Sequence, residues 1–127
     1  MAYRICENLV KKNWSSYADD LDKAPLNAEG IYAIGVERAG DVRYLYVGHT
    51  RNIRRRLQEH RRLNQTLKID QFVQKTLRER NAAKTLRIKW VEERSNKRAE
   101  EKYLLECLGK KIGYWPEYNR KAWCKGK

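Results

Sequence analysis

Two short runs of tyrosine, valine and isoleucine, residues 30–37 and 42–48, constrain the fold of this chain more than any other feature. Such residues favour strands, and the Ala39-Gly40-Asp41 segment between the runs has the composition of a tight turn. The segment therefore predicts a β-hairpin. A third run, residues 85–92, alternates apolar and polar side chains as a half-buried strand does. Together the runs predict a small, mainly antiparallel sheet of three strands.

Helices are expected around this sheet, because apolar residues recur at helical spacing in four other segments. These segments are residues 4–22, 52–63, 70–80 and 96–110. A chain of 127 residues has room for one compact domain. The expected fold is therefore a single α/β domain in which helices flank a three-stranded sheet.

The net charge is +13, and all of the positive excess lies in residues 49–127, which hold 23 basic against nine acidic side chains. Charge concentrated in this way favours binding to nucleic acid, where affinity comes largely from counterion release at phosphates. The alternatives are a solvated basic surface and attraction to anionic lipid. No apolar run approaches the roughly 20 residues that span a bilayer, so no membrane contact is expected.

The three cysteines of the chain, Cys6, Cys107 and Cys124, form neither a paired framework nor a Cys-x-x-Cys metal motif. Disulfide-poor chains are typical of reducing compartments. We therefore expect an intracellular protein.

The predicted helix at 52–63 carries polar residues in its apolar arc. At about 100° per residue, Arg56 and His60 fall between Ile53, Leu57 and Leu63. Burying a guanidinium in such an arc costs free energy unless the group has a partner or a function. The alternatives to a functional arginine are a buried structural ion pair, or a side chain whose aliphatic stem packs while its charged head reaches solvent. The remaining arginines of the helix fall on the solvent side: Arg54, Arg55, Arg61 and Arg62.

The predicted helix at 96–110 gives a similar result for one carboxylate. Glu101 lies among Leu104, Leu105 and Leu108, whereas Glu106 lies about 140° away from it. An inward carboxylate could form a salt bridge with the inward arginine, or it could bind a hard divalent cation through its oxygens.

Read together in order, these residues resemble the GIY-YIG nuclease family over about residues 29–120. The first motif is Gly30-Ile31-Tyr32 and the second is Tyr46-Val47-Gly48. The family pattern is completed by His49, Arg56, His60, Glu101 and Asn119. Residues 1–28 lie outside the resemblance and are expected to form a helical extension packed on a nuclease domain of residues 29–127.

The resemblance implies a metal-dependent endonuclease that hydrolyses phosphodiester bonds, in DNA more than in RNA. It implies one Mg²⁺ or Mn²⁺ held by Glu101, although Glu106 fits the family spacing to Asn119 better. The duplex would be cut by a homodimer, by two visits, or on one strand only.

The resemblance also implies a role for each site residue. Arg56 would pair with a nonbridging phosphate oxygen, Tyr32 would accept the proton of water, and Tyr46 would position water or phosphate. His60 would orient a tyrosine or act as the base itself, while Asn119 would hold the site together by hydrogen bonds. Nucleic acid would be bound by exposed arginines: Arg51, Arg54, Arg55, Arg61 and Arg62.

Two other classes of function remain open. A binding module could keep the nuclease fold without cutting, and a basic scaffold protein would need none of the inward polar residues.

Overall fold

A four-stranded antiparallel sheet forms the centre of the computed structural model, which describes residues 2–62, 67–93 and 98–119. The strands follow the order β1-β4-β2-β3 across the sheet. Their bounds are Ser15–Ser16 for β1, Gly30–Arg38 for β2, Asp41–Thr50 for β3 and Leu86–Glu92 for β4. The predicted hairpin and the third strand are thus confirmed, but the prediction of three strands is wrong because β1 adds a fourth.

The hairpin of β2 and β3 turns at Ala39 and Gly40, whose φ angles of 53° and 84° lie in the left-handed region. A bulge interrupts its register, because Ile34 pairs with Tyr46 and Gly35 pairs with Tyr44, which leaves Leu45 as an extra residue. As a result, Leu45 and its neighbour Tyr46 pack against the same side of the sheet.

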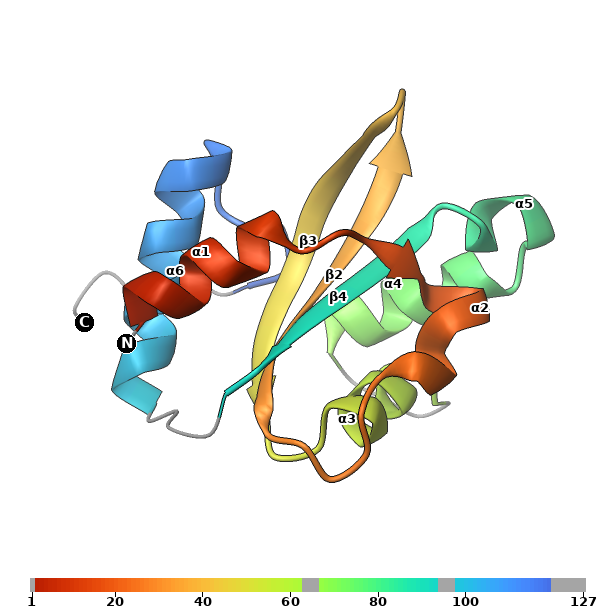
Figure 1. Cartoon of the computed structure of the whole chain (residues 1–127). Coiled ribbons are helices and arrows are strands. Elements are labelled where there is room, and N and C mark those ends of the chain that lie inside the picture. The colour runs from red at the N-terminus through yellow and green to blue at the C-terminus, as the bar shows by residue number, and fades with distance from the viewer. Residues whose placement is uncertain (1, 63–66, 94–97, 120–127) are drawn as a thin grey trace.

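Helical layers cover both faces of this sheet (Figure 1). One face is covered by α1 and α6, which contact each other. The other is covered by the helices that lie between residues 17 and 83. The helices are α1 at Ala2–Lys11, α2 at Tyr17–Asp20, the 3-10 turn η1 at Leu21–Lys23, α3 at Ile53–Glu59, α4 at Lys68–Leu77, α5 at Arg80–Ala83 and α6 at Arg98–Ile112.

The prediction of a single helix over residues 4–22 is wrong. Helix α1 ends at Lys11, two residues of β1 then pair with Ile88 and Arg87 of β4, and α2 begins directly afterwards. The Ser16 side chain caps α2 by accepting a hydrogen bond from the backbone N–H of Asp19. The apolar spacing of 4–22 therefore belongs to two helices that pack on opposite faces of the sheet.

The other predicted helices are confirmed with shifted ends. The helix predicted at 52–63 is shorter, so that Arg61 and Arg62 lie beyond α3, and the one predicted at 70–80 is followed by the separate helix α5. In the described part of the chain, no helix combines the length and the apolar character that a membrane crossing requires.

Candidate active site

The glycine of the second tyrosine motif makes room for the tyrosine of the first. Tyr32 on β2 and Gly48 on β3 are cross-strand partners. A Cβ atom on Gly48 would lie only 2.6 Å from the Tyr32 hydroxyl oxygen. The Tyr32 side chain can therefore lie across β3 only because residue 48 has no side chain, which is a physical reason for the two motifs to occur together.

Helix α3 brings Arg56 and His60 to the same face of the sheet. Its first turn is capped by Asn52, whose side chain accepts a hydrogen bond from the backbone N–H of Arg55. Ile53 and Leu57 are buried in the core beneath the helix. His60 lies at the end of the helix and is fully buried, while Arg56 is half-buried. The prediction that both residues lie in the apolar arc is confirmed.

Tyr32, His60 and Asp70 form a hydrogen-bonded chain in the core. The Tyr32 hydroxyl lies 2.6 Å from Nε2 of His60, and Nδ1 of His60 contacts Oδ1 of Asp70. Tyr32 is 1% exposed and the other two are 0% exposed. The chain therefore links β2, α3 and α4 without reaching the surface.

Asp70 is a site residue that the sequence reasoning missed. It lies about 100° round α4 from Ile69, next to Leu77 at about 80° and Val73 at about 40°. The residue spacing of α4 thus places Asp70 in an apolar arc, as the spacing of α3 does for Arg56, and could have identified it from the sequence.

Burial controls the protonation of Tyr32 and His60 in this hydrogen-bonded set. It raises the pKa of Tyr32 well above its usual value, and the nearby Arg56 guanidinium offsets only part of that effect. Burial also lowers the pKa of His60, and Arg56 adds to the decrease, although Asp70 opposes it. At neutral pH the phenol is therefore protonated and the imidazole is neutral. In the free protein, the effect of burial on the pKa of Tyr32 therefore outweighs that of the nearby Arg56 guanidinium.

Tyr46 and Arg56 are the site residues of this face that reach solvent. The Tyr46 ring lies 6.1 Å from the Tyr32 ring and 5.4 Å from the His60 ring, centroid to centroid, and it is half-buried. One guanidinium nitrogen of Arg56 lies 3.1 Å from a carboxylate oxygen of Glu59, one turn along α3. An anion that bound Arg56 would therefore compete with Glu59 for its guanidinium.

Asn119 fastens the end of the described chain to β3 beside Tyr46. Its side-chain oxygen accepts a hydrogen bond from the backbone N–H of Val47, and its side-chain nitrogen donates to the Val47 carbonyl, at 2.8 and 2.9 Å. The backbone N–H of Tyr118 also donates to the Leu45 carbonyl. Asn119 thus extends the pairing along the edge strand and supports the strand that carries Tyr46.

His49 and Arg54 are not brought to this site. His49 lies beside Ile31, on the face covered by α1 and α6, and its Nε2 lies 3.0 Å from a carboxylate oxygen of Glu29. The Arg54 side chain donates to the backbone carbonyls of Asp22 and Ala24, which tie α3 to the η1 segment. The prediction that Arg54 is exposed is therefore wrong, because its side chain is held in a structural contact. The other predicted nucleic-acid-binding arginines are exposed: Arg51, Arg55, Arg61 and Arg62.

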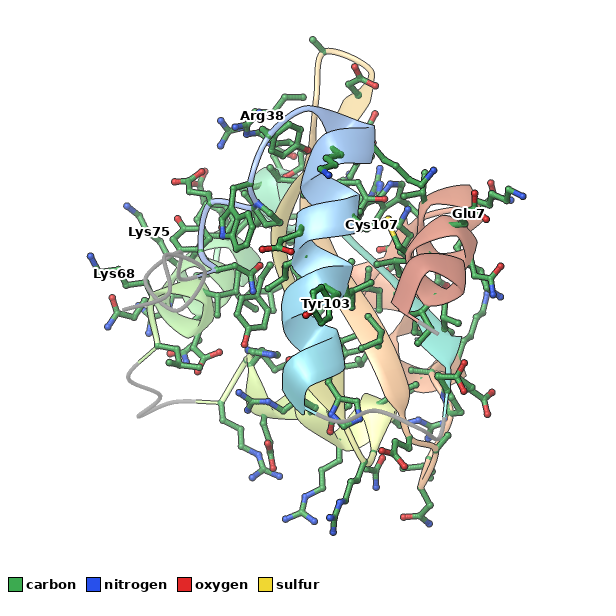
Figure 2. The ribbon with its side chains drawn as sticks, turned by 90° about the vertical axis from the view of Figure 1, so that its left-hand side faces the viewer. Glu7, Arg38, Lys68, Lys75, Tyr103 and Cys107 are labelled. Carbon is green, nitrogen blue, oxygen red and sulfur yellow. The ribbon has the colours of Figure 1, made fainter. Side chains whose placement is uncertain are left out.

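The candidate metal ligand lies at the start of α6, but the Glu101 side chain is outside the described residues. Leu104, Leu105 and Leu108 are buried as predicted, on the α1 side of the sheet. Glu106 is half-buried and lines a shallow groove with Lys110 and Trp115. Figure 2 shows Tyr103 on the outer face of this helix. Among the described residues, no group of three or more His, Cys, Asp or Glu side chains could hold a metal ion.

A family model for the GIY-YIG catalytic domain matches residues 29–114, which include both tyrosine motifs, α3 and all of α6. Neither the comparison with curated proteins nor the comparison with solved structures gave a match.

Proposed function

The chain belongs to the GIY-YIG family, whose catalytic domain is a nuclease domain, and on this premise we propose that it is a metal-dependent endonuclease that cuts DNA. One observation carries the proposal: Tyr32, Tyr46, Arg56 and His60 come from three elements and gather on one face of the sheet. A basic scaffold would not need these polar groups in its core.

Arg56 binds the scissile phosphate in this proposal. Guanidinium and phosphate share a bidentate geometry, and the Arg56 guanidinium interacts electrostatically with both tyrosines. Tyr46 is half-buried beside it and positions the phosphate or the attacking water. Tyr32 accepts the proton of that water and passes its own proton to His60, which lies at hydrogen-bond distance. Because Tyr32 is buried, Arg56 and Tyr46 must shift when substrate binds.

Glu101 is the proposed ligand of Mg²⁺ or Mn²⁺. A single carboxylate suits a hard cation that keeps most of its water, and an ion held there would supply positive charge for the phosphate and the leaving oxygen. Glu101→Gln keeps the size of the side chain and removes the charge. It should eliminate metal-dependent cutting and leave DNA binding intact, whereas Glu106→Gln should cut like the parent protein. The reverse result would assign the metal to Glu106.

The exposed arginines of the α3 region bind the rest of the nucleic acid in this proposal, and they are Arg51, Arg55, Arg61 and Arg62. A single site cuts both strands of a duplex through a homodimer or through two visits. We place the protein inside the cell, where Cys6 and Cys107 remain free thiols as they do in the structure.

A cleavage assay with and without Mg²⁺ tests the proposal on plasmid, single-stranded and branched DNA and on an RNA duplex. Arg56→Ala should abolish cutting with binding and folding retained, because Arg56 acts at the scissile phosphate. Arg61→Ala removes an equally charged but exposed side chain and serves as the matched control, which should still cut. Binding by the parent protein without cutting of any substrate would support the alternative of a non-catalytic module.

A further inference from the structure

Asp70 occupies a position where a carboxylate is costly. It is fully buried on α4 between Ile69 and Val73, which belong to the core. Oδ1 contacts the imidazole of His60, but Oδ2 has no hydrogen-bond partner among the described residues. A buried carboxylate that is only partly satisfied destabilises the fold relative to an apolar residue. Its presence therefore calls for a reason other than packing.

A structural ion pair does not supply that reason, because burial and Arg56 keep the pKa of His60 low and the imidazole neutral at neutral pH. What the contact does determine is the position of the histidine proton. A carboxylate can only accept, so the proton lies on Nδ1 and the lone pair of Nε2 points at the Tyr32 hydroxyl.

We propose that Asp70 is a positioning residue, which holds His60 in the Nδ1–H tautomer so that Nε2 can take the hydroxyl proton of Tyr32 during phosphodiester cleavage. The inference rests on the proposed nuclease function. It assigns a role to a residue that lies outside both tyrosine motifs and outside the α3 pair.

Protons and electron pairs balance in this step. The O–H bond of Tyr32 breaks, its electron pair stays on the phenolate oxygen beside Arg56, and a new N–H bond forms at Nε2. The resulting imidazolium is stabilised by Asp70. Water then gives a proton to the phenolate as its oxygen bonds to phosphorus and the bond to the leaving oxygen breaks. Solvent protonates the leaving oxygen. His60, which is fully buried, returns its Nε2 proton to the Tyr32 hydroxyl as that hydroxyl gives its own proton to solvent. The same division of roles operates in serine hydrolases, where a buried aspartate orients the histidine.

Several ionisable groups surround His60, and all of them contribute to its pKa. Asp70 and Glu59 raise its pKa and Arg56 lowers it. Its other titratable neighbours are Tyr32, which it hydrogen-bonds, Tyr46, whose ring it contacts, and Tyr17, which lies close to Asp70 and bonds the Leu57 carbonyl. Replacing Asp70 by a neutral side chain should therefore lower the pKa of His60.

Nitrogen NMR of the histidine rings tests the tautomer directly. The chain has two histidines, so a protein labelled with ¹⁵N-histidine shows two imidazoles, and His49→Gln identifies the signal of His60. The parent protein should show His60 in the Nδ1–H form. In Asp70→Asn the amide can donate to Nδ1, so His60 should change to the Nε2–H form, and its pKa should fall.

Cleavage supplies the second readout. Asp70→Asn should lower the rate on the order of 10²- to 10⁴-fold with DNA binding unchanged, as a wrong histidine tautomer does in serine hydrolases. Tyr17→Phe is the matched control. It removes another buried hydrogen bond of the same core, to the Leu57 carbonyl, and leaves the hydrogen bonds among Tyr32, His60 and Asp70 in place. It should lower stability but keep both the tautomer and the cleavage rate.

Each outcome decides the inference. An Nε2–H form of His60 in the parent protein would overturn it, and this measurement needs no variant to fold. An Asp70→Asn protein that cuts at the parent rate would also overturn it. If Asp70→Asn inverts the tautomer but no protein cuts any substrate, the positioning role is confirmed and the nuclease function is the part that fails.

Discussion

At the scale of single residues, the site depends on side chains that are small or polar where the surroundings favour the opposite. Gly48 has no side chain because the Tyr32 phenol occupies that space. His60 and Asp70 are polar groups in an apolar layer that includes Leu57 and Val73. Such residues reduce stability, and they are kept where geometry matters more than packing.

Gly48→Ala tests whether cleavage depends on the position of Tyr32 as well as on the stability of the fold. The new Cβ would overlap the Tyr32 hydroxyl, so the phenol would have to move and its hydrogen bond to His60 would be disturbed. We expect a loss of about 1 to 3 kcal/mol in the free energy of unfolding, as for other overpacked cores, and a loss of cleavage even well below the melting temperature. Urea unfolding and a cleavage assay measure the two effects.

Gly109→Ala is the control for this substitution. Its Cβ would meet only ordinary contacts, at 3.5 and 3.9 Å, inside helix α6. Because alanine favours helices over glycine by about 1 kcal/mol, this variant should be as stable as the parent or more so. A Gly48→Ala protein with parent-like cleavage would show that the Tyr32 position is not critical.

At the scale of elements, local patterns predicted what short-range interactions determine. The hairpin was predictable because its two strands are adjacent in the chain and their turn contains Gly40. Strand β1 was not predictable, because two serines become a strand only by pairing with Ile88 and Arg87, more than 70 residues later. The break before α2 did have a local signal, which is the capping Ser16 followed by Asp19.

The same distinction applies to the site. Arg56 and His60 were found because a helical wheel depends only on sequence spacing. The face occupied by His49 follows from strand alternation after the bulge at Leu45, and Arg54 binds carbonyls of a segment 30 residues earlier. The position of His49 could therefore have been predicted, because it lies three residues after Tyr46 on the same strand and hence on the opposite face. The Arg54 contact cannot be read from the spacing of residues along one element.

Lys89 joins the sheet to the end of α1 and should make stability depend on pH. The Lys89 side chain is 3% exposed. Its amine contacts the Val10 and Lys12 carbonyls and the rings of Trp14 and Tyr44. Burial lowers its pKa to about 8. The unfolded chain keeps the lysine proton up to about pH 10.4. The contribution of Lys89 to the free energy of unfolding should therefore rise as pH increases above about 8.

The comparison with Lys89→Met isolates this effect. Burial raises the pKa of Cys6 to about 12 and also raises that of Tyr17, and these groups lower stability as pH rises. Their contribution is the same in both proteins, so it cancels in the difference. Between pH 7.5 and 9.5, urea unfolding should show the parent gaining about 2 kcal/mol over Lys89→Met. The exposed substitution Lys84→Met should leave the pH dependence unchanged.

At the scale of the whole molecule, charge and site lie in the same layer. The exposed arginines Arg61 and Arg62 follow α3, which carries Arg56 into the site. Figure 2 shows Lys68 and Lys75 of α4 on the opposite side of the molecule from Glu7 of α1. A polyanion attracted to the α3 and α4 side would therefore meet the half-buried Tyr46 and Arg56.

Salt dependence distinguishes this arrangement from a general effect of net charge. In a non-cutting Arg56→Ala protein, the double variant Arg61→Gln, Arg62→Gln should neutralise up to two fewer phosphates of duplex DNA. The slope of log K against log salt should then become shallower by about 0.9 for each phosphate that is no longer neutralised. The double variant Lys11→Gln, Lys12→Gln removes the same charge from exposed positions on and just after α1, across the sheet, and should keep the parent slope. Equal slopes in both double variants would mean that total charge, rather than a defined surface beside the site, governs binding.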